Sequence, residues 1–102
     1  MSVRPPAVAG TFYPASPSEL KSQVEGFLQG SGPVSVPKGV IAPHAGYVYS
    51  GPIAGSAFRR LAPAASAIRR VILLGPSHFV PIRGLALPDR QRFETPLGQV
   101  TV

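Results

Sequence analysis

Two short apolar runs, each followed by a turn and a histidine, constrain this sequence more than any other feature. Residues 40–42 form the first run, and Pro43 ends it because a proline has no N–H to donate to a sheet. Residues 71–74 form the second run, which a Gly-Pro-Ser turn separates from His78. We therefore expect two strands whose carboxyl ends each lead into a histidine, with His44 following the first.

The segment between the two runs predicts a helix. Ser50 followed by glycine and proline is typical of a helix start, and it predicts a helix over residues 52–61. Its buried side would consist of Ile53, Ala57, Phe58 and Leu61. With strands over 38–42 and 69–74, the order strand, helix, strand makes residues 38–78 a βαβ unit with parallel strands and a right-handed crossover.

The N-terminal segment supports this unit. Prolines at positions 5, 6 and 14 exclude a long helix, so residues 1–15 are predicted to form an extended arm. Ser16, Pro17 and Glu19 then predict a capped helix start, and apolar residues at helical spacing continue this helix to near Gly30.

The predicted fold class is α/β, with a parallel or mixed sheet and flanking helices. Beyond the second histidine, residues 85–87 are a candidate strand, residues 93–98 are interpreted as a loop, and residues 99–102 as the beginning of a strand. Parallel sheets are normally covered on both faces, and these elements are too few for that. We therefore expect residues 1–102 to be the incomplete N-terminal portion of a single domain.

Composition argues against several classes of protein. The chain has no cysteine, so it forms no disulfide or thiolate metal site, and no apolar run approaches the roughly 20 residues of a membrane span. We expect a cytoplasmic protein without a membrane partner. The formal charge is +6, but the ten lysines and arginines are spread out with no run longer than two. We interpret them as a solvated basic surface, or a face for a missing acidic segment, rather than a nucleic-acid site.

The two histidines are the candidate metal ligands. The carboxyl ends of neighbouring parallel strands lie about 4.8 Å apart at one edge of a sheet, where ligands of open α/β sheets bind. Neutral imidazoles bind zinc, copper or ferrous iron, usually together with a carboxylate or thiolate. The alternative is that His44 and His78 are polar turn residues, each bonded to backbone. The matched placement of both favours a site.

Several neighbouring residues have candidate roles in such a site. Tyr47 and Tyr49 are candidates to line a cleft, although we expect one of the pair to pack in the core. Ser77 is a candidate ligand-orienting or substrate-binding residue, with a plain turn residue as the alternative. A helix start at residues 50–53 would leave N–H groups free for an anion, with ordinary capping as the alternative.

Four longer motifs follow one another along the chain. They are Val3-Arg-Pro-Pro-Ala-Val-Ala-Gly-Thr-Phe-Tyr-Pro14, Ile41-Ala-Pro-His-Ala-Gly-Tyr-Val-Tyr-Ser-Gly51, Leu74-Gly-Pro-Ser-His78 and Phe93-Glu-Thr-Pro-Leu-Gly98. Together they resemble the Memo family, whose prokaryotic members are called AmmeMemoRadiSam system protein B. The resemblance covers essentially the whole chain. It implies an α/β fold similar to that of the class III extradiol dioxygenases, which are non-haem iron enzymes that open catechol rings.

The resemblance also implies a metal site. In Memo-like proteins the corresponding cleft is lined by histidines and a cysteine that can bind iron or copper. His44 matches the family's Ala-Pro-His-Ala-Gly position and His78 its Gly-Pro-Ser-His position, so both carry over as metal-site residues. Family members are longer, and their cysteine belongs to a C-terminal part that this sequence lacks. The third ligand is expected from there.

The reaction stays open at this point. One hypothesis is a metal-dependent, redox-active enzyme when full length, and the alternative is a non-catalytic module that binds a ligand or protein in the same cleft. The family's genomic name adds a radical-SAM protein as a candidate partner. For residues 1–102 alone we expect no catalysis, because two imidazoles hold a metal weakly without a third protein ligand. We also expect exposed apolar surface that favours self-association or a partner.

Overall fold

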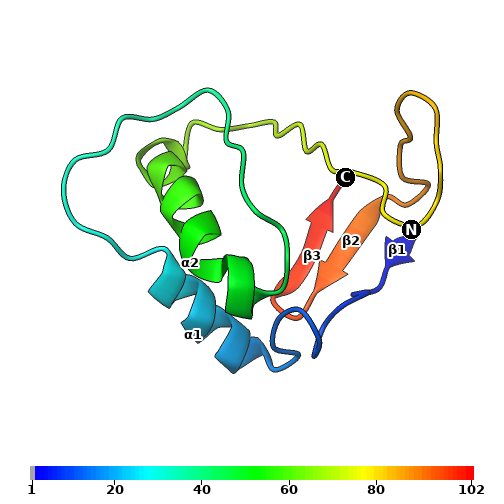
Figure 1. Cartoon of the computed structure of the whole chain (residues 1–102), viewed down its shortest axis with the longest axis horizontal. Coiled ribbons are helices and arrows are strands. Elements are labelled where there is room, and N and C mark those ends of the chain that lie inside the picture. Colours follow the sequence, from blue (N-terminus) through cyan, green and yellow to red (C-terminus); the bar gives the residue numbers. More distant parts are fainter. Residues whose placement is uncertain (1) are drawn as a thin grey trace.

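In the computed structural model, which describes residues 2–102, two helices pack together on one side of the molecule and a small sheet lies on the other (Figure 1). The elements are β1 (Val3–Arg4), α1 (Pro17–Phe27), α2 (Tyr47–Phe58), the 3-10 helix η1 (Arg59–Ala64), β2 (Arg92–Thr95) and β3 (Gly98–Thr101). β1 is parallel to β2, and β2 is antiparallel to β3. The chain is therefore a small α/β structure with a mixed sheet.

The first helix begins where the sequence predicts it. Ser16 is the N-cap of α1, its hydroxyl accepts the N–H of the third helical residue at 3.4 Å, and Pro17 is the first residue of the helix. Leu20 points inward and is only 4% exposed, which makes it the one buried large apolar side chain of residues 2–102. The helix ends at Phe27 rather than near Gly30.

The second helix begins earlier than predicted. α2 starts at Tyr47 with Gly46 as its N-cap, so Ser50 lies inside the first turn and Pro52 inside the helix. The N–H of Tyr47 donates to the carbonyl of Phe12 at 2.8 Å, which satisfies one of the amides that a helix start leaves free. A contact with a distant part of the chain therefore decides where α2 begins, and the local cap signal does not.

Small residues, rather than the predicted apolar side, pack α2 against α1. Gly51 and Gly55 are buried, and a Cβ atom at either position would overlap Phe27 of α1. Ile53 is instead 64% exposed and Phe58 48% exposed, so the prediction that these two residues form the buried side is wrong. Close approach of the Phe27 ring to the α2 backbone sets the rotation of α2, and this rotation directs Ile53 outward.

The strands predicted over 38–42, 69–74 and 85–87 are not among the strands of residues 2–102. Residues 71–74 are 75–88% exposed. A strand needs a paired neighbour for its N–H and C=O groups, and an apolar parallel strand also needs cover on both faces. Neither is provided within residues 2–102, where the helices contact each other and the strands contact each other. Of the predicted βαβ unit over 38–78, only the helix forms.

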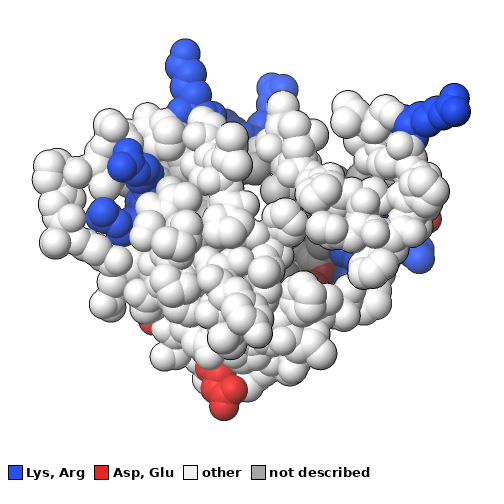
Figure 2. Space-filling view, viewed as in Figure 1, with Lys and Arg blue, Asp and Glu red and all other residues white. Residues whose placement is uncertain are grey.

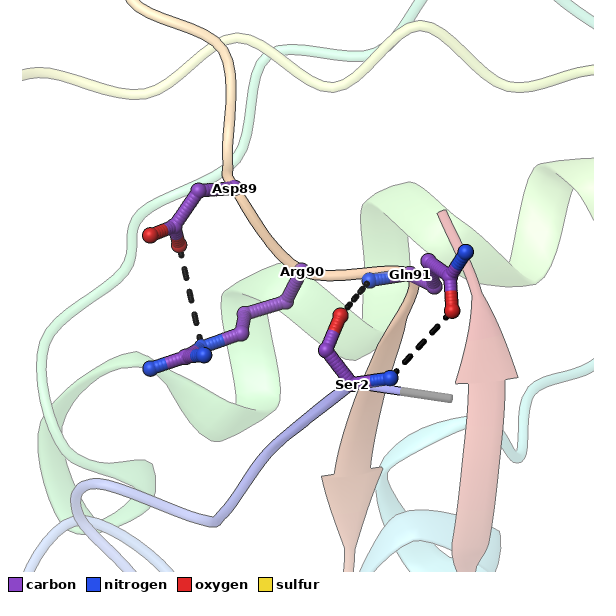
Figure 3. Close-up of polar contacts among 4 residues, drawn as sticks. All are labelled: Ser2, Asp89, Arg90 and Gln91. Atoms are coloured by element: carbon purple, nitrogen blue, oxygen red, sulfur yellow. Dashed lines mark hydrogen bonds and ion pairs between the residues drawn. The ribbon is translucent and has the colours of Figure 1, made fainter.

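The two ends of the chain meet in the sheet. β1 pairs with β2 so that Arg4 lies opposite Phe93, and the guanidinium carbon of Arg4 is 5.3 Å from the centre of the Phe93 ring. Next to this pair, the Ser2 N–H donates to Oε1 of Gln91 at 3.2 Å, and the Gln91 N–H donates to the Ser2 hydroxyl at 3.1 Å (Figure 3). The N-terminal segment is thereby held against the beginning of β2.

Residues 93–98, predicted as a loop, instead form the end of β2 and the turn into β3. Thr95 closes this turn, because its hydroxyl accepts the N–H of Leu97 and donates to the carbonyl of Gly98, both at 3.1 Å. Gly98 has a φ of 129°, which side chains other than glycine rarely adopt. The strand predicted over 99–102 is confirmed as β3.

The arm predicted over residues 1–15 is extended only in part. After β1 it forms a compact turn in which Gly10, with a φ of 85°, donates its N–H to the carbonyl of Tyr13 at 2.7 Å. The N–H of Phe12 donates to the carbonyl of Val8 at 2.9 Å within the same turn. These local bonds leave the carbonyl of Phe12 free to accept from α2.

The surface carries dispersed positive charge. On the face shown in Figure 2, lysine and arginine side chains project at the top, left and right of the view, and the most prominent acidic group lies at the bottom. Within residues 2–102, none of the helices has the length and apolar character that crossing a bilayer requires.

Substitution of Gly55 tests the helix contact. Gly55→Ala is expected to destabilise the chain by about 1–3 kcal/mol, because the added methyl group overlaps the Phe27 carbonyl and forces the helices apart. Gly26→Ala in α1 is the matched control, since its Cβ would meet nothing within 4 Å and alanine is favoured over glycine in helices by about 0.5–1 kcal/mol. Urea unfolding followed by circular dichroism measures both. Equal stability of the two variants would contradict the close packing.

Candidate functional site

The structure places the two histidines of the sequence motifs side by side. The Nε2 atoms of His44 and His78 are 3.2 Å apart, and the ring centroids are 5.4 Å apart with an interplanar angle of 39°. Both residues are exposed. The loops that follow residues 40–42 and 71–74 bring the rings together, although these segments are not paired as strands. The hydrogen-bonding contact of each ring is with the other ring rather than with backbone.

The separation of the two nitrogens fits two ligands of one metal ion. Imidazole nitrogens bind zinc at about 2.0–2.1 Å, so two ligands lie about 3.0 Å apart at a right angle and about 3.4 Å apart at the tetrahedral angle. The observed distance of 3.2 Å lies between these values. It also fits a hydrogen bond between a protonated and an unprotonated ring nitrogen. The pair can therefore hold a metal ion through two nitrogens or share a proton.

The candidate metal ligands at this place are the two imidazole nitrogens of His44 and His78. Among residues 2–102, no three or more side chains of His, Cys, Asp or Glu are grouped so that they could hold a metal ion. Of the acidic residues near the C-terminus, Asp89 lies 3.7 Å from Arg90 and Glu94 lies in β2.

Two hydrogen bonds hold the loop that carries His44. The hydroxyl of Ser50 accepts the N–H of Ala45, the residue directly after His44, at 2.9 Å. The carbonyl of Phe12 accepts the N–H of Tyr47 at 2.8 Å. Ser50 is only 5% exposed. Sequence reasoning treated Ser50 as a helix cap and missed this contact, because no local motif predicts a hydrogen bond from a helical serine back to the fifth residue before it.

Residues 50–53 do not form a helix start, so the anion site that was considered there lacks the free N–H groups it would need. α2 begins at Tyr47, and the N–H groups of both Tyr49 and Ser50 donate to the carbonyl of Gly46 at 2.9 Å. Residues 50–53 are therefore inside the helix, where their amides are not presented to a ligand.

An apolar cavity of about 500 Å³ lies next to His44. The arm, α1 and α2 all contribute to its walls, and the apolar lining includes Val8, Phe12, Tyr13, Val24, Phe27, Leu28, Ala54 and Phe58. The side chains in its walls that carry a polar atom are those of Tyr13, His44, Tyr47 and Ser50. This volume and this predominance of apolar lining are typical of small-molecule sites.

The three other candidate residues are placed differently from one another. Tyr47 lines the cavity, with its ring 5.7 Å from that of Tyr13 and 6.0 Å from that of Phe27. Tyr49 is largely exposed and is not part of the cavity wall. Ser77 donates its hydroxyl hydrogen to the carbonyl of Val80 and so closes its own turn. Their roles in binding a substrate or lining a cleft stay predictions.

Comparison with known proteins identifies the family. A family model described as "Memo-like protein" matches residues 4–102. The chain belongs to the Memo-like family. The zebrafish (Danio rerio) protein MEMO1 is 43% identical over 103 residues, which cover 100% of this chain and 34% of that protein. A MEMO1 family protein of Ignicoccus hospitalis is 41% identical, covering 98% of this chain and 39% of that protein.

The Memo-like chain is short in comparison with these relatives. The memo-1 homolog of Caenorhabditis elegans is 39% identical over 95 residues, covering 92% of this chain and 27% of that protein. The chain therefore spans about a third of the length of the curated relatives that it matches. The activity and partners of a whole Memo-like protein come to this chain only as proposals.

Titration of the Tyr47 phenol tests whether this residue is buried in the cavity wall. Burial raises the pKa of the Tyr47 phenol above its usual value of 10.0, and a charged Tyr13 nearby raises it further. The unfolded chain then ionises first, so this contribution to stability is present below about pH 10 and is lost as the pH rises through the pKa of the folded chain. We expect Tyr47→Phe to remove the part of the tyrosinate absorbance change that occurs at the highest pH. The same substitution should remove the decrease in stability that accompanies ionisation of Tyr47. An unchanged titration curve, apart from amplitude, would contradict the burial of Tyr47.

Proposed function

We propose that this Memo-like chain supplies the two-histidine part of a metal-binding cleft related to those of the non-haem iron dioxygenases. The observation that supports it most directly is the 3.2 Å separation of the His44 and His78 Nε2 atoms, which matches two ligands of one metal ion. Iron or copper is the proposed metal, with a third ligand contributed by a part of a Memo-like protein that lies outside these 102 residues. The fold of the whole domain is proposed to resemble that of the class III extradiol dioxygenases.

In such a cleft the histidines of this chain would bind the metal, and its apolar residues would line the space beside it. His44 and His78 would hold the metal through their Nε2 atoms, which lie 3.2 Å apart. The apolar wall next to His44, which includes Tyr47 and Phe12, would contact an apolar part of a molecule bound beside the pair. A bound iron or copper ion would supply Lewis acidity and one-electron chemistry to a molecule in the cleft. In a longer protein this combination supports a metal-dependent oxidoreductase.

Metal titration of the purified chain tests the first part of the proposal. We expect weak one-to-one binding of ferrous iron or of cobalt as its probe, because two imidazoles without a third protein ligand hold metal loosely. His44→Ala and His78→Ala should each weaken binding by about tenfold or more. Calorimetry or the visible spectrum of cobalt measures the affinity.

Phe79→Leu is the control for the metal titration. The Phe79 ring lies 6.4 Å from the ring of His78 in the same turn but has no ligand atom, so binding should be unchanged. Binding that survives in both histidine variants would overturn the proposed site. A tight complex of the unsubstituted chain that is lost in His44→Ala would instead show that two imidazoles suffice.

The second candidate function is a binding module without turnover. The observation in its favour is the apolar cavity of about 500 Å³ beside His44, which can hold a ligand whether or not chemistry takes place there. The proposed binding partners of such a module are a peptide, another protein or a radical-SAM protein.

Oxygen uptake separates the two functions. The test protein is a chimera in which residues 1–102 replace the matching segment of the Ignicoccus hospitalis relative, so that a full-length Memo-like chain is restored. With ferrous iron and a reductant, the redox proposal predicts oxygen consumption that His44→Ala lowers at least about tenfold. Metal binding without oxygen consumption would favour the binding module.

A further inference from the structure

Ser50 has an unusual place in α2. It is the fourth residue of the helix, it is 5% exposed, and its own N–H is already bonded to the carbonyl of Gly46 at 2.9 Å. Its hydroxyl oxygen lies 2.9 Å from the backbone nitrogen of Ala45, outside the helix. A serine hydroxyl this deep in a structure normally has a partner, because an unpaired buried polar group is unfavourable. Here the partner is the residue next to His44.

The geometry around this bond leaves His44 little freedom. On one side Pro43 restricts the backbone through its ring. On the other side the Ser50 hydroxyl holds the N–H of Ala45, and the Phe12 carbonyl holds the N–H of Tyr47. The His44 ring itself is exposed, and its hydrogen-bonding contact is with the ring of His78 on a second, separate loop. Backbone contacts therefore determine where the imidazole lies.

We propose that Ser50 is a positioning residue for His44, which sets the loop so that the His44 imidazole stays within ligand distance of His78. It acts through the backbone of Ala45 and touches neither ring. The part of this proposal that concerns metal affinity rests on the proposed function. The part that concerns the distance between the two rings does not, because it is argued from the positions of the rings and of the Ser50 hydroxyl alone.

Three substitutions distinguish positioning from general stabilisation. Ser50→Ala removes the hydroxyl acceptor at nearly constant volume, and Ser50→Thr keeps it. Ser56→Ala is the matched control, because Ser56 lies on the same helix and its hydroxyl bonds only to the carbonyl of Pro52, at 3.0 Å. Circular dichroism compares the helix content of all three with that of the unsubstituted chain. If Ser50→Ala loses helix, Ser50→Cys replaces it, because a thiol of similar size is a weak acceptor.

The primary measurement is the nuclear Overhauser contact between the ring protons of His44 and His78 in the metal-free chain. We expect this cross-peak to fall severalfold in Ser50→Ala, to return in Ser50→Thr and to persist in Ser56→Ala. The Ala45 amide should also exchange with solvent faster in Ser50→Ala alone. A cross-peak of full intensity in a folded Ser50→Ala variant would overturn the positioning role.

The metal affinity of the same variants is the second measurement. Contacts that orient a ligand typically change metal affinity by about 10–100-fold, and we expect a loss near the lower value, about tenfold, in Ser50→Ala with recovery in Ser50→Thr. If the unsubstituted chain binds no metal, the proposed function fails while the cross-peak still decides the role of Ser50. If the unsubstituted chain binds metal and Ser50→Ala binds it equally well, the positioning role fails while the proposed function stands.

Discussion

The hydrogen bond between the Tyr47 N–H and the Phe12 carbonyl joins the N-terminal arm to α2 and to the loop that carries His44. It connects the N-terminal arm to α2 at the point where the loop carrying His44 enters the helix. The arm reaches this position because its turn is closed by local backbone bonds around Gly10. The chain then continues through α1, whose Phe27 packs on the glycines of α2. Arm, helices and histidine loop are therefore held in one arrangement, and the cavity beside His44 is the space between them.

A second physical constraint is the apolar surface that this arrangement leaves uncovered. Residues 71–74 are largely exposed, and Val48 and Ile53 point away from the helix contact of α2. Exposed apolar patches of this kind are typical of surfaces that contact a protein, a ligand or a membrane. The curated relatives are about three times as long as this chain, with coverage of 27–39% for the three described above. The chain therefore combines a large exposed apolar surface with about a third of the length of these relatives.

Local signals predicted the elements that depend on local contacts. The start of α1 followed from Ser16 and Pro17. The start of α2 could not be found this way, because the Phe12 carbonyl that caps it is distant in sequence. The hairpin of β2 and β3 was missed because residues 93–98 were interpreted as a loop, and the pairing of β2 with β1 depends on a segment at the other end of the chain. For the candidate site, both histidines were found from their motifs, while the hydrogen bond from Ser50 was not.

The sequence by itself determined the family, the cap of α1 and the two histidines, because each is written in a short contiguous motif. Only the tertiary structure decided that the two Nε2 atoms lie 3.2 Å apart, that glycines form the helix contact, and that the ends of the chain share a sheet. It also decided that the two apolar runs stay unpaired within residues 2–102. The physical reason is common to all of these: strand pairing, burial and ligand geometry depend on which distant segments meet, and no local pattern specifies that.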